Sequence, residues 1–139
     1  MVKKPIFDTS VYSDYTAEIE KIYTSALFPT IVLYELTATS IDDSTLQRYK
    51  RWRITLNKIN AIVNPFPTDW WETAKAIRRL YLMKAAPQTK LKTSRNDALI
   101  ARLAVIHGGF VVTHDIDDFQ IIQKAMPKLE VVSADEFFN

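Results

Sequence analysis

Short apolar segments alternate with longer segments of helical periodicity from one end of the chain to the other. The short segments have the length and β-branched content of buried strands, which we expect at residues 4–7, 26–28, 61–63, 110–113 and 130–133. The longer segments predict helices at residues 30–40, 45–58, 68–84, 98–106 and 114–125. Strands that alternate with helices form parallel sheets covered on both faces. The sequence therefore predicts a three-layer α/β/α fold with a central parallel sheet of four or five strands.

Local signals refine these expectations. Residues 86–93 are polar and basic and contain a proline, which predicts a loop. The glycines at 108–109 predict the end of the preceding helix, whose start Ser94 or Asn96 can cap. Residues 30–40 begin with β-branched side chains, so a strand is the alternative there. The helix expected at 68–84 has apolar residues on one face: Trp70, Ala74, Ile77, Leu80 and Tyr81.

Length and composition exclude several kinds of protein. The chain has 139 residues, 47% of them hydrophobic, which fits one globular domain spanning residues 1–139. The absence of Cys excludes disulfide scaffolds, Cys-ligated zinc and a thiol nucleophile. Two adjacent Gly cannot build a phosphate-binding glycine loop, and two His are too few for a histidine-built metal site. Without a signal peptide or a long apolar run, we expect a soluble, cytoplasmic protein with no membrane segment.

Charge is distributed unevenly along the chain. Residues 46–96 contain twelve basic and two acidic residues, a net charge of +10, which leaves six basic and fourteen acidic residues elsewhere. This difference in sign fits two solvated helix faces. It also fits a polyanion held by its phosphates beside an acidic site at which metal ions mask the carboxylates.

Acidic residues follow the expected strands or begin the expected helices. Asp8 and Asp115 come directly after strands, Asp97 lies in the first turn of a helix, and Glu35 has apolar neighbours on both sides. Taken singly, Asp8 and Asp115 can be helix caps, Asp97 can complement a helix dipole, and Glu35 can lie on an exposed helix stripe. Taken together, acids at one edge of a parallel sheet suit a ligand site. Oxygen ligands without Cys or many His select Mg²⁺ or Mn²⁺.

Four segments in a fixed order resemble a known family. These segments are I-F-D-T-S at residues 6–10, F-P-T-I-V-L-Y-E-L at 28–36, N-D-A-L-I-A-R-L-A at 96–104 and T-H-D-I-D-D-F at 113–119. The ordered set resembles the PIN-domain nucleases, and among them the VapC-like toxins of toxin-antitoxin pairs. The resemblance implies an endoribonuclease that depends on Mg²⁺ or Mn²⁺. The acids that it implies for catalysis and metal binding are Asp8, Glu35, Asp97 and Asp115.

The resemblance also implies supporting residues. Asp118 matches an additional acid near the site, whereas Asp117 matches a variable position. A small hydroxyl residue near the first acid is matched by Thr9 or Ser10, and the one after the strand at 110–113 is matched by Thr113. At position 102 the family has a small side chain and this chain has Arg102, which is a departure that concerns local packing.

Such a site would hydrolyse phosphodiester bonds. One or two metal ions held by Asp8, Asp97 and Asp115, with Glu35 binding directly or through water, would activate a hydroxide and stabilise the leaving oxyanion. We expect the RNA phosphates to contact Lys90, Lys92 and Arg95. Trp70 and Trp71 can stack on bases, but we expect at least one of them to pack in the core. The expected partners are RNA, a cognate antitoxin protein and a second copy of the chain in a homodimer.

Alternative functions are weighed on the same residues. A phospho-receiver domain needs an acidic pair after its first strand, whereas Asp8 has no acidic neighbour. A haloacid-dehalogenase phosphatase needs a second acid two residues later, where Ser10 stands. The remaining alternative is a PIN module that binds RNA or a partner protein without cleaving RNA.

Overall fold

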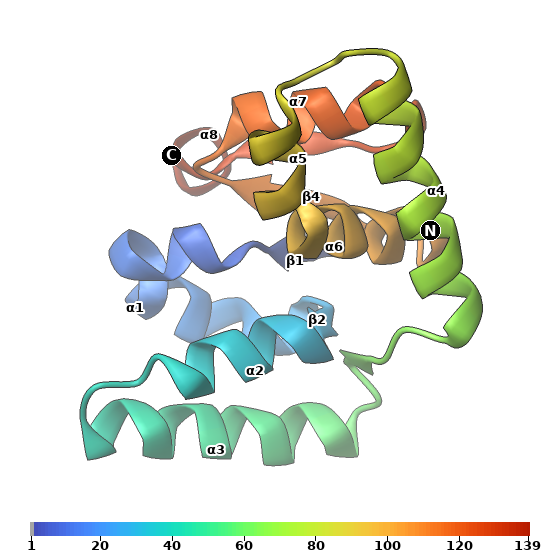
Figure 1. The fold of residues 1–139 in the computed structure, drawn as a ribbon. Helices are drawn as coiled ribbons and strands as arrows, with labels where there is room; N and C mark the ends of the chain where they lie inside the picture. Colours follow the sequence, from blue (N-terminus) through green and yellow to red (C-terminus); the bar gives the residue numbers. More distant parts are fainter. Residues whose placement is uncertain (1) are drawn as a thin grey trace.

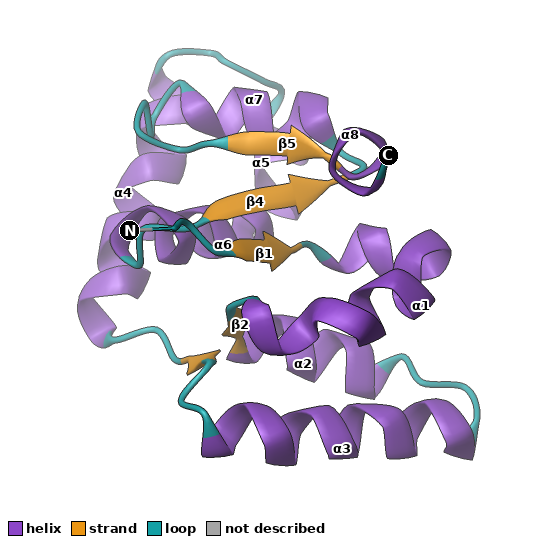
Figure 2. Cartoon of the chain, turned by 180° about the vertical axis from the view of Figure 1, so that it is seen from behind, coloured by secondary structure: helices purple, strands orange, loops and turns teal. Residues whose placement is uncertain are grey.

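The computed structural model describes residues 2–139 as short strands between helices (Figures 1 and 2). The strands are β1 (Pro5–Phe7), β2 (Phe28–Pro29), β3 (Ile62–Val63), β4 (Phe110–Thr113) and β5 (Val131–Ser133). The α-helices are α1 (Tyr12–Ile22), α2 (Thr30–Ala38), α3 (Asp43–Lys58), α4 (Pro67–Leu82), α5 (Gln88–Thr93), α6 (Arg95–Ile106), α7 (Ile116–Gln123) and α8 (Ala134–Phe138). Two short 3₁₀ helices are η1 (Thr9–Val11) and η2 (Tyr23–Ser25).

Three strands form the central sheet, in the order β1-β4-β5 and with all neighbours parallel. The expectation of four or five strands in one sheet is wrong, because β2 and β3 pair only with each other. The Leu27 N–H donates to the Pro5 carbonyl at 3.0 Å, which places β2 beside β1. Because β2 has two residues and Pro29 has no N–H to donate, this contact does not extend into a ladder.

Helices lie on both sides of the central sheet. Figure 1 shows α6 in front of the sheet, flanked by α4 and α5, and Figure 2 shows the strands from the opposite side. On that side α8 packs against the sheet, where the Phe137 ring lies 5.5 Å from Phe7 and 6.0 Å from Phe110 between ring centroids. The sheet is therefore the middle of three layers.

The α2–α3 pair is joined to the rest of the molecule by a buried aromatic group. Trp52 of α3 is fully buried and packs against the rings of Tyr12, Tyr23, Phe28 and Tyr49. Burying such large rings is a major contribution to core stability. Figure 1 shows α2 and α3 stacked below β2.

The structure differs from the sequence expectations around α5. Residues 88–93 form a helix instead of continuing as a loop, and α6 follows after Ser94 alone. Neither Ser94 nor Asn96 caps α6, because the backbone at Ser94 stays near helical geometry and its hydroxyl donates to the Lys90 carbonyl instead. Helix α6 ends at Ile106, and Gly108 follows it with a φ of 67°, which confirms the predicted helix end. After β5 the acidic residues Asp135 and Glu136 lie in the first turn of α8.

The buried face of α4 is not the one that apolar spacing indicated. The helix buries Asp69, Thr73, Ala76 and Leu80, and of the expected face only Leu80 is among them. Trp70 and Trp71 are 55% and 65% exposed, so the expectation that one of them packs in the core is wrong. Among residues 2–139, no helix combines the length and apolar character that a membrane crossing needs.

Candidate active site

The ends of β1 and β4 place Asp8 beside Thr113. Phe7 is paired with Val112, and the Asp8 N–H donates to the Val112 carbonyl at 3.0 Å. The buried Asp8 carboxylate then receives two hydroxyl hydrogen bonds on Oδ2, from Ser10 and Thr113, each at 2.9 Å. Two adjacent parallel strands therefore fix the direction of one carboxylate.

The same hydroxyls hold the loop after β4. The Asp115 N–H donates to Thr113 Oγ1 at 2.8 Å, and the His114 N–H donates to Ser10 Oγ at 3.2 Å. The side chains of Asp8 and Asp115 make no capping hydrogen bond to the helices that follow them. The helix-cap interpretation of these two acids is therefore wrong.

Glu35 reaches this region from α2. It is half-buried, and its Oε1 accepts a hydrogen bond from Asn96 Nδ2 of α6 at 3.4 Å. Burial and the negative charge of Asp8 raise the pKa of Glu35, while hydrogen bonds from Thr9 and Asn96 partly oppose the shift. Sequence reasoning considered Asn96 only as a helix cap. Its position directly before Asp97 was the one signal for a role at the site.

Asp97 lies where the charges of the other acids converge. Its pKa is raised to about 7, first by burial and then by the carboxylates of Asp8, Asp115, Asp118 and Glu35, in that order. Burial also raises the pKa of Asp8, with a further contribution from Asp115, although its hydroxyl partners lower it. The four predicted acids and Asp118 therefore share one region at the carboxyl ends of β1 and β4. Asp117 is exposed.

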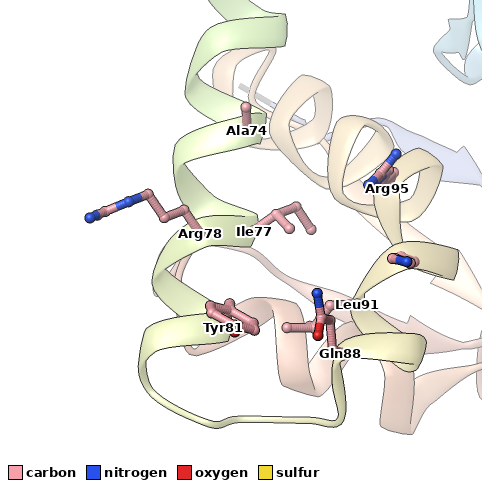
Figure 3. Close-up of a pocket in the computed structure, with 8 residues that line it drawn as sticks. Ala74, Ile77, Arg78, Tyr81, Gln88, Leu91 and Arg95 are labelled. Atoms are coloured by element: carbon pink, nitrogen blue, oxygen red, sulfur yellow. The ribbon is translucent and has the colours of Figure 1, made fainter.

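Of the three predicted phosphate ligands, Lys90 lies at the acidic region. Lys90 Nζ is 2.7 Å from Asp118 Oδ1, which ties α5 to α7. Lys92 and Arg95 are exposed and line a hollow between α4 and the α5–α6 corner (Figure 3). Thr9 lies in η1, and of the two predicted hydroxyls it is Ser10 that contacts Asp8.

The donor chemistry of this region fits a hard divalent cation, but the carboxylates are not gathered into a ligand cluster. Within residues 2–139, no group of three or more His, Asp or Glu side chains is close enough together to hold a metal ion. Carboxylate oxygens are the ligands that Mg²⁺ and Mn²⁺ prefer. Burial first, and then the negative charges of the neighbouring acids, raise the pKa of Asp97, and a cation bound among these groups would offset both effects.

Arg102 has a structural partner at the interface of α4 and α6. Its Nε lies 3.1 Å from Oδ1 of the buried Asp69, whose Oδ2 accepts the Phe66 N–H at 2.8 Å. Arg102 stands where the resemblance implied a small side chain, and its ion pair with Asp69 accommodates it.

Comparison with known proteins identifies the fold. No protein-family model matches the sequence, and no curated protein matches it. Solved structures do match. The structure of VapBC2 from Rickettsia felis bound to a promoter DNA fragment matches with a TM-score of 0.58 and 19% identity, over 93% of this chain and 97% of that chain. DNA-bound VapBC from Salmonella typhimurium matches with a TM-score of 0.59 and 20% identity, over 96% and 99%.

This chain has the fold of those VapBC chains. The predicted three-layer α/β/α fold class with a central parallel sheet is confirmed, with three strands in that sheet.

Proposed function

We propose that this chain is a metal-dependent endoribonuclease and the toxin of a toxin-antitoxin pair. The observation that carries the proposal is the convergence of the charges of Asp8, Glu35, Asp97 and Asp115 on one region of a fold shared with VapBC chains. Carboxylates are rarely brought together unless a cation or a proton compensates them. Mg²⁺ or Mn²⁺ would supply that compensation.

Each side chain has a role in the proposed reaction. Asp8, Asp97 and Asp115 would hold the cation, with Glu35 binding it directly or through water. A bound cation would lower the pKa of the attacking water and stabilise the leaving oxyanion. The hydroxyls of Ser10 and Thr113 keep Asp8 in one orientation, and Asn96 does the same for Glu35.

RNA phosphates would be held by the basic surface beside the acids. Lys92 and Arg95 are exposed there, and Lys90 bridges to Asp118. Lys90 would exchange this carboxylate for a phosphate when RNA binds, because both are oxyanions of similar reach. Asp118 would then be free to support the metal site.

The partner proteins are proposed by analogy of fold. The two solved structures compared above are VapBC complexes bound to DNA. We therefore propose an antitoxin partner for this chain and a homodimer as its own assembly. Light scattering of the purified chain, alone and with the product of an adjacent gene, measures both states.

One experiment tests the activity. A labelled RNA is incubated with the protein in Mg²⁺, in Mn²⁺ and in EDTA, together with Asp97→Asn and Asp117→Asn. We expect cleavage only with metal, a loss of orders of magnitude for Asp97→Asn, and near-wild-type cleavage for Asp117→Asn, which keeps the same charge change at an exposed position. Circular dichroism verifies that both variants fold.

A second candidate is an RNA-binding or partner-binding module without cleavage. The absence of a ready-made three-ligand cluster among residues 2–139 favours it. RNA binding without cleavage in either metal would establish this candidate. Equal losses of cleavage in Asp97→Asn and Asp117→Asn would contradict the assignment of Asp97 as a metal ligand and of Asp117 as an acid outside the site.

A further inference from the structure

A hollow of ≈ 270 Å³ lies between α4 and the α5–α6 corner, outside the acidic region (Figure 3). Its volume is slightly below the range of about 300–1,000 Å³ that is usual for small-molecule sites. A space of this size suits one flat ring system better than a larger ligand. Its walls come from residues 74–81 of α4 and from residues 88–95 of α5 and the start of α6.

The wall of the hollow combines apolar and aromatic surface with one amide. Leu91 is buried and Ile77 is half-buried, whereas the Tyr81 ring is 51% exposed. Figure 3 shows Gln88 beside Leu91 and facing Tyr81 across the hollow. An exposed aromatic ring offers a stacking surface, and an amide offers both donors and an acceptor. A planar group with a polar edge meets both kinds of contact here.

Cations lie on both sides of this surface. Lys92 and Arg95 belong to the α5–α6 corner, and Figure 3 shows the Arg78 side chain extending outward from α4. Within residues 2–139, none of these three side chains forms an ion pair with a carboxylate. The two acids of the basic segment are already engaged, Asp69 with Arg102 and Glu72 with Lys75. The hollow therefore has uncompensated positive charge at two edges.

We infer that this hollow binds one unstacked nucleobase of an RNA strand, with the base against Tyr81 and the flanking phosphates at Arg78 and at Lys92 and Arg95. The inference rests on the proposed function and adds a binding pocket to it. An aromatic platform with cations along the backbone path is the arrangement that single-stranded nucleic acid requires. An acidic peptide would satisfy the cations but would leave the Tyr81 ring and the Gln88 amide without matched groups.

The α5–α6 corner separates the hollow from the acidic region. Arg95 precedes Asp97 by two residues at the start of α6, and Lys90, two residues before Lys92, is paired with Asp118. Side chains two residues apart on a helix point to different sides, so a strand that leaves the hollow would cross the α5–α6 corner to reach the acids. The pocket would hold a nucleotide away from the cleaved bond and contribute to the choice of cleavage position.

Photo-cross-linking tests the position of the base without requiring cleavage. A single-stranded oligoribonucleotide containing 5-iodouracil is irradiated with the full chain in EDTA, and the adducts are mapped by mass spectrometry. We expect an adduct on Tyr81 that is absent in Tyr81→Leu. Met83→Ala, which removes a similarly exposed apolar side chain two residues away, should retain it.

Affinity for the same RNA, measured by fluorescence anisotropy in EDTA, tests the stacking interaction. Removal of one base–aromatic stack corresponds to a roughly 5- to 150-fold weaker Kd, which we expect for Tyr81→Leu. Tyr81→Phe keeps the ring and should stay close to wild type. Replacing Lys92 and Arg95 with Gln should reduce the slope of log affinity against log salt by about 0.7 for each phosphate that is no longer neutralised. Lys58→Gln, at the exposed end of α3, should leave the slope unchanged.

The outcomes separate this inference from the proposed nuclease function. A Tyr81 adduct in a protein that never cleaves RNA supports the pocket and contradicts the nuclease proposal. Cleavage by a protein whose Tyr81→Leu variant binds RNA normally, and which gives no Tyr81 adduct, overturns the pocket alone. Displacement of the RNA from Tyr81 by poly-glutamate as readily as by polyuridylate also overturns it, because charge alone would then explain binding.

Discussion

The Thr113 hydroxyl donates to Asp8 Oδ2 at 2.9 Å while it accepts the Asp115 N–H at 2.8 Å. One buried side chain at the end of β4 thus orients the acid that follows β1 and the backbone of the acid that follows β4. Its removal would leave a buried carboxylate with one hydroxyl partner fewer and a backbone donor without a partner.

Thr113→Val should therefore lower the free energy of unfolding by about 1–3 kcal/mol, because it preserves shape and removes only the hydroxyl. Urea denaturation at pH 7 measures the change. Thr113→Ser keeps the hydroxyl and should lose less than Thr113→Val. A valine variant as stable as wild type would show that these hydrogen bonds make no net contribution.

The raised pKa of Asp97 predicts a pH-dependent difference between wild type and Asp97→Asn in EDTA. The pKa rises from about 3.9 in the unfolded chain to about 7 in the folded protein. The stability that protonated Asp97 provides is therefore complete below about pH 3.9 and is lost as the pH rises through 7. The variant stays neutral, so its Tm should match wild type near pH 4 and exceed it above pH 7.

Thermal melts of both proteins across that pH range, with Asp117→Asn as the matched charge control, provide the measurement. Asp97→Asn also loses the interaction of the Asp97 charge with the helix dipole, which lowers the stability of the variant by about 0.3–1 kcal/mol. An Asp97→Asn variant that melts clearly below wild type at pH 8 would identify Asp97 as a structural acid of the helix start.

The ion pair between Arg102 and Asp69 predicts energetic coupling between α4 and α6. Asp69 is 3% exposed, so removal of its cation in Arg102→Met should cost about 1–3 kcal/mol of unfolding free energy. In an Asp69→Asn background the same change should cost at least about 0.5 kcal/mol less. A double-mutant cycle from urea denaturation measures this coupling. Strictly additive effects would mean that the ion pair adds nothing to stability.

Gly109 is confined by the backbone of the N-terminal segment. A Cβ at this position would lie 2.8 Å from the Lys4 carbonyl oxygen, which the β1–β4 pairing holds in place. Gly109→Ala should therefore lower the free energy of unfolding by about 1–3 kcal/mol. Gly108→Asn is the control, because space is open there and Asn tolerates the positive φ. Equal stability of the two variants in urea would show that the backbone at Lys4 can move aside at little cost.

The sequence by itself determined the layered α/β fold and the neighbourhood of the acids. Strands alternating with helices can bury their apolar faces in few ways, and the carboxyl ends of parallel strands meet at one edge. Asp8 and Asp115 follow such strands, so their proximity was predictable. Asp97, in the first turn of a helix, and Glu35, among apolar neighbours, were candidates from the sequence as well, and the family resemblance assigned them to the same site; their charges do act on the same region.

Only the tertiary structure decided which side chains serve as partners. Asn96 contacts Glu35 and Arg102 contacts Asp69, and in both pairs the two residues are far apart in sequence. No local sequence pattern predicts such contacts. The α4 face with more apolar residues lies outward, and the opposite face, which includes Asp69, Thr73 and Ala76, is buried, with Asp69 paired to Arg102 of α6. That outward face, with Tyr81 on it, now forms a wall of the hollow. Helix period is visible in a sequence, but the direction in which a helix docks depends on the summed contacts of its neighbours.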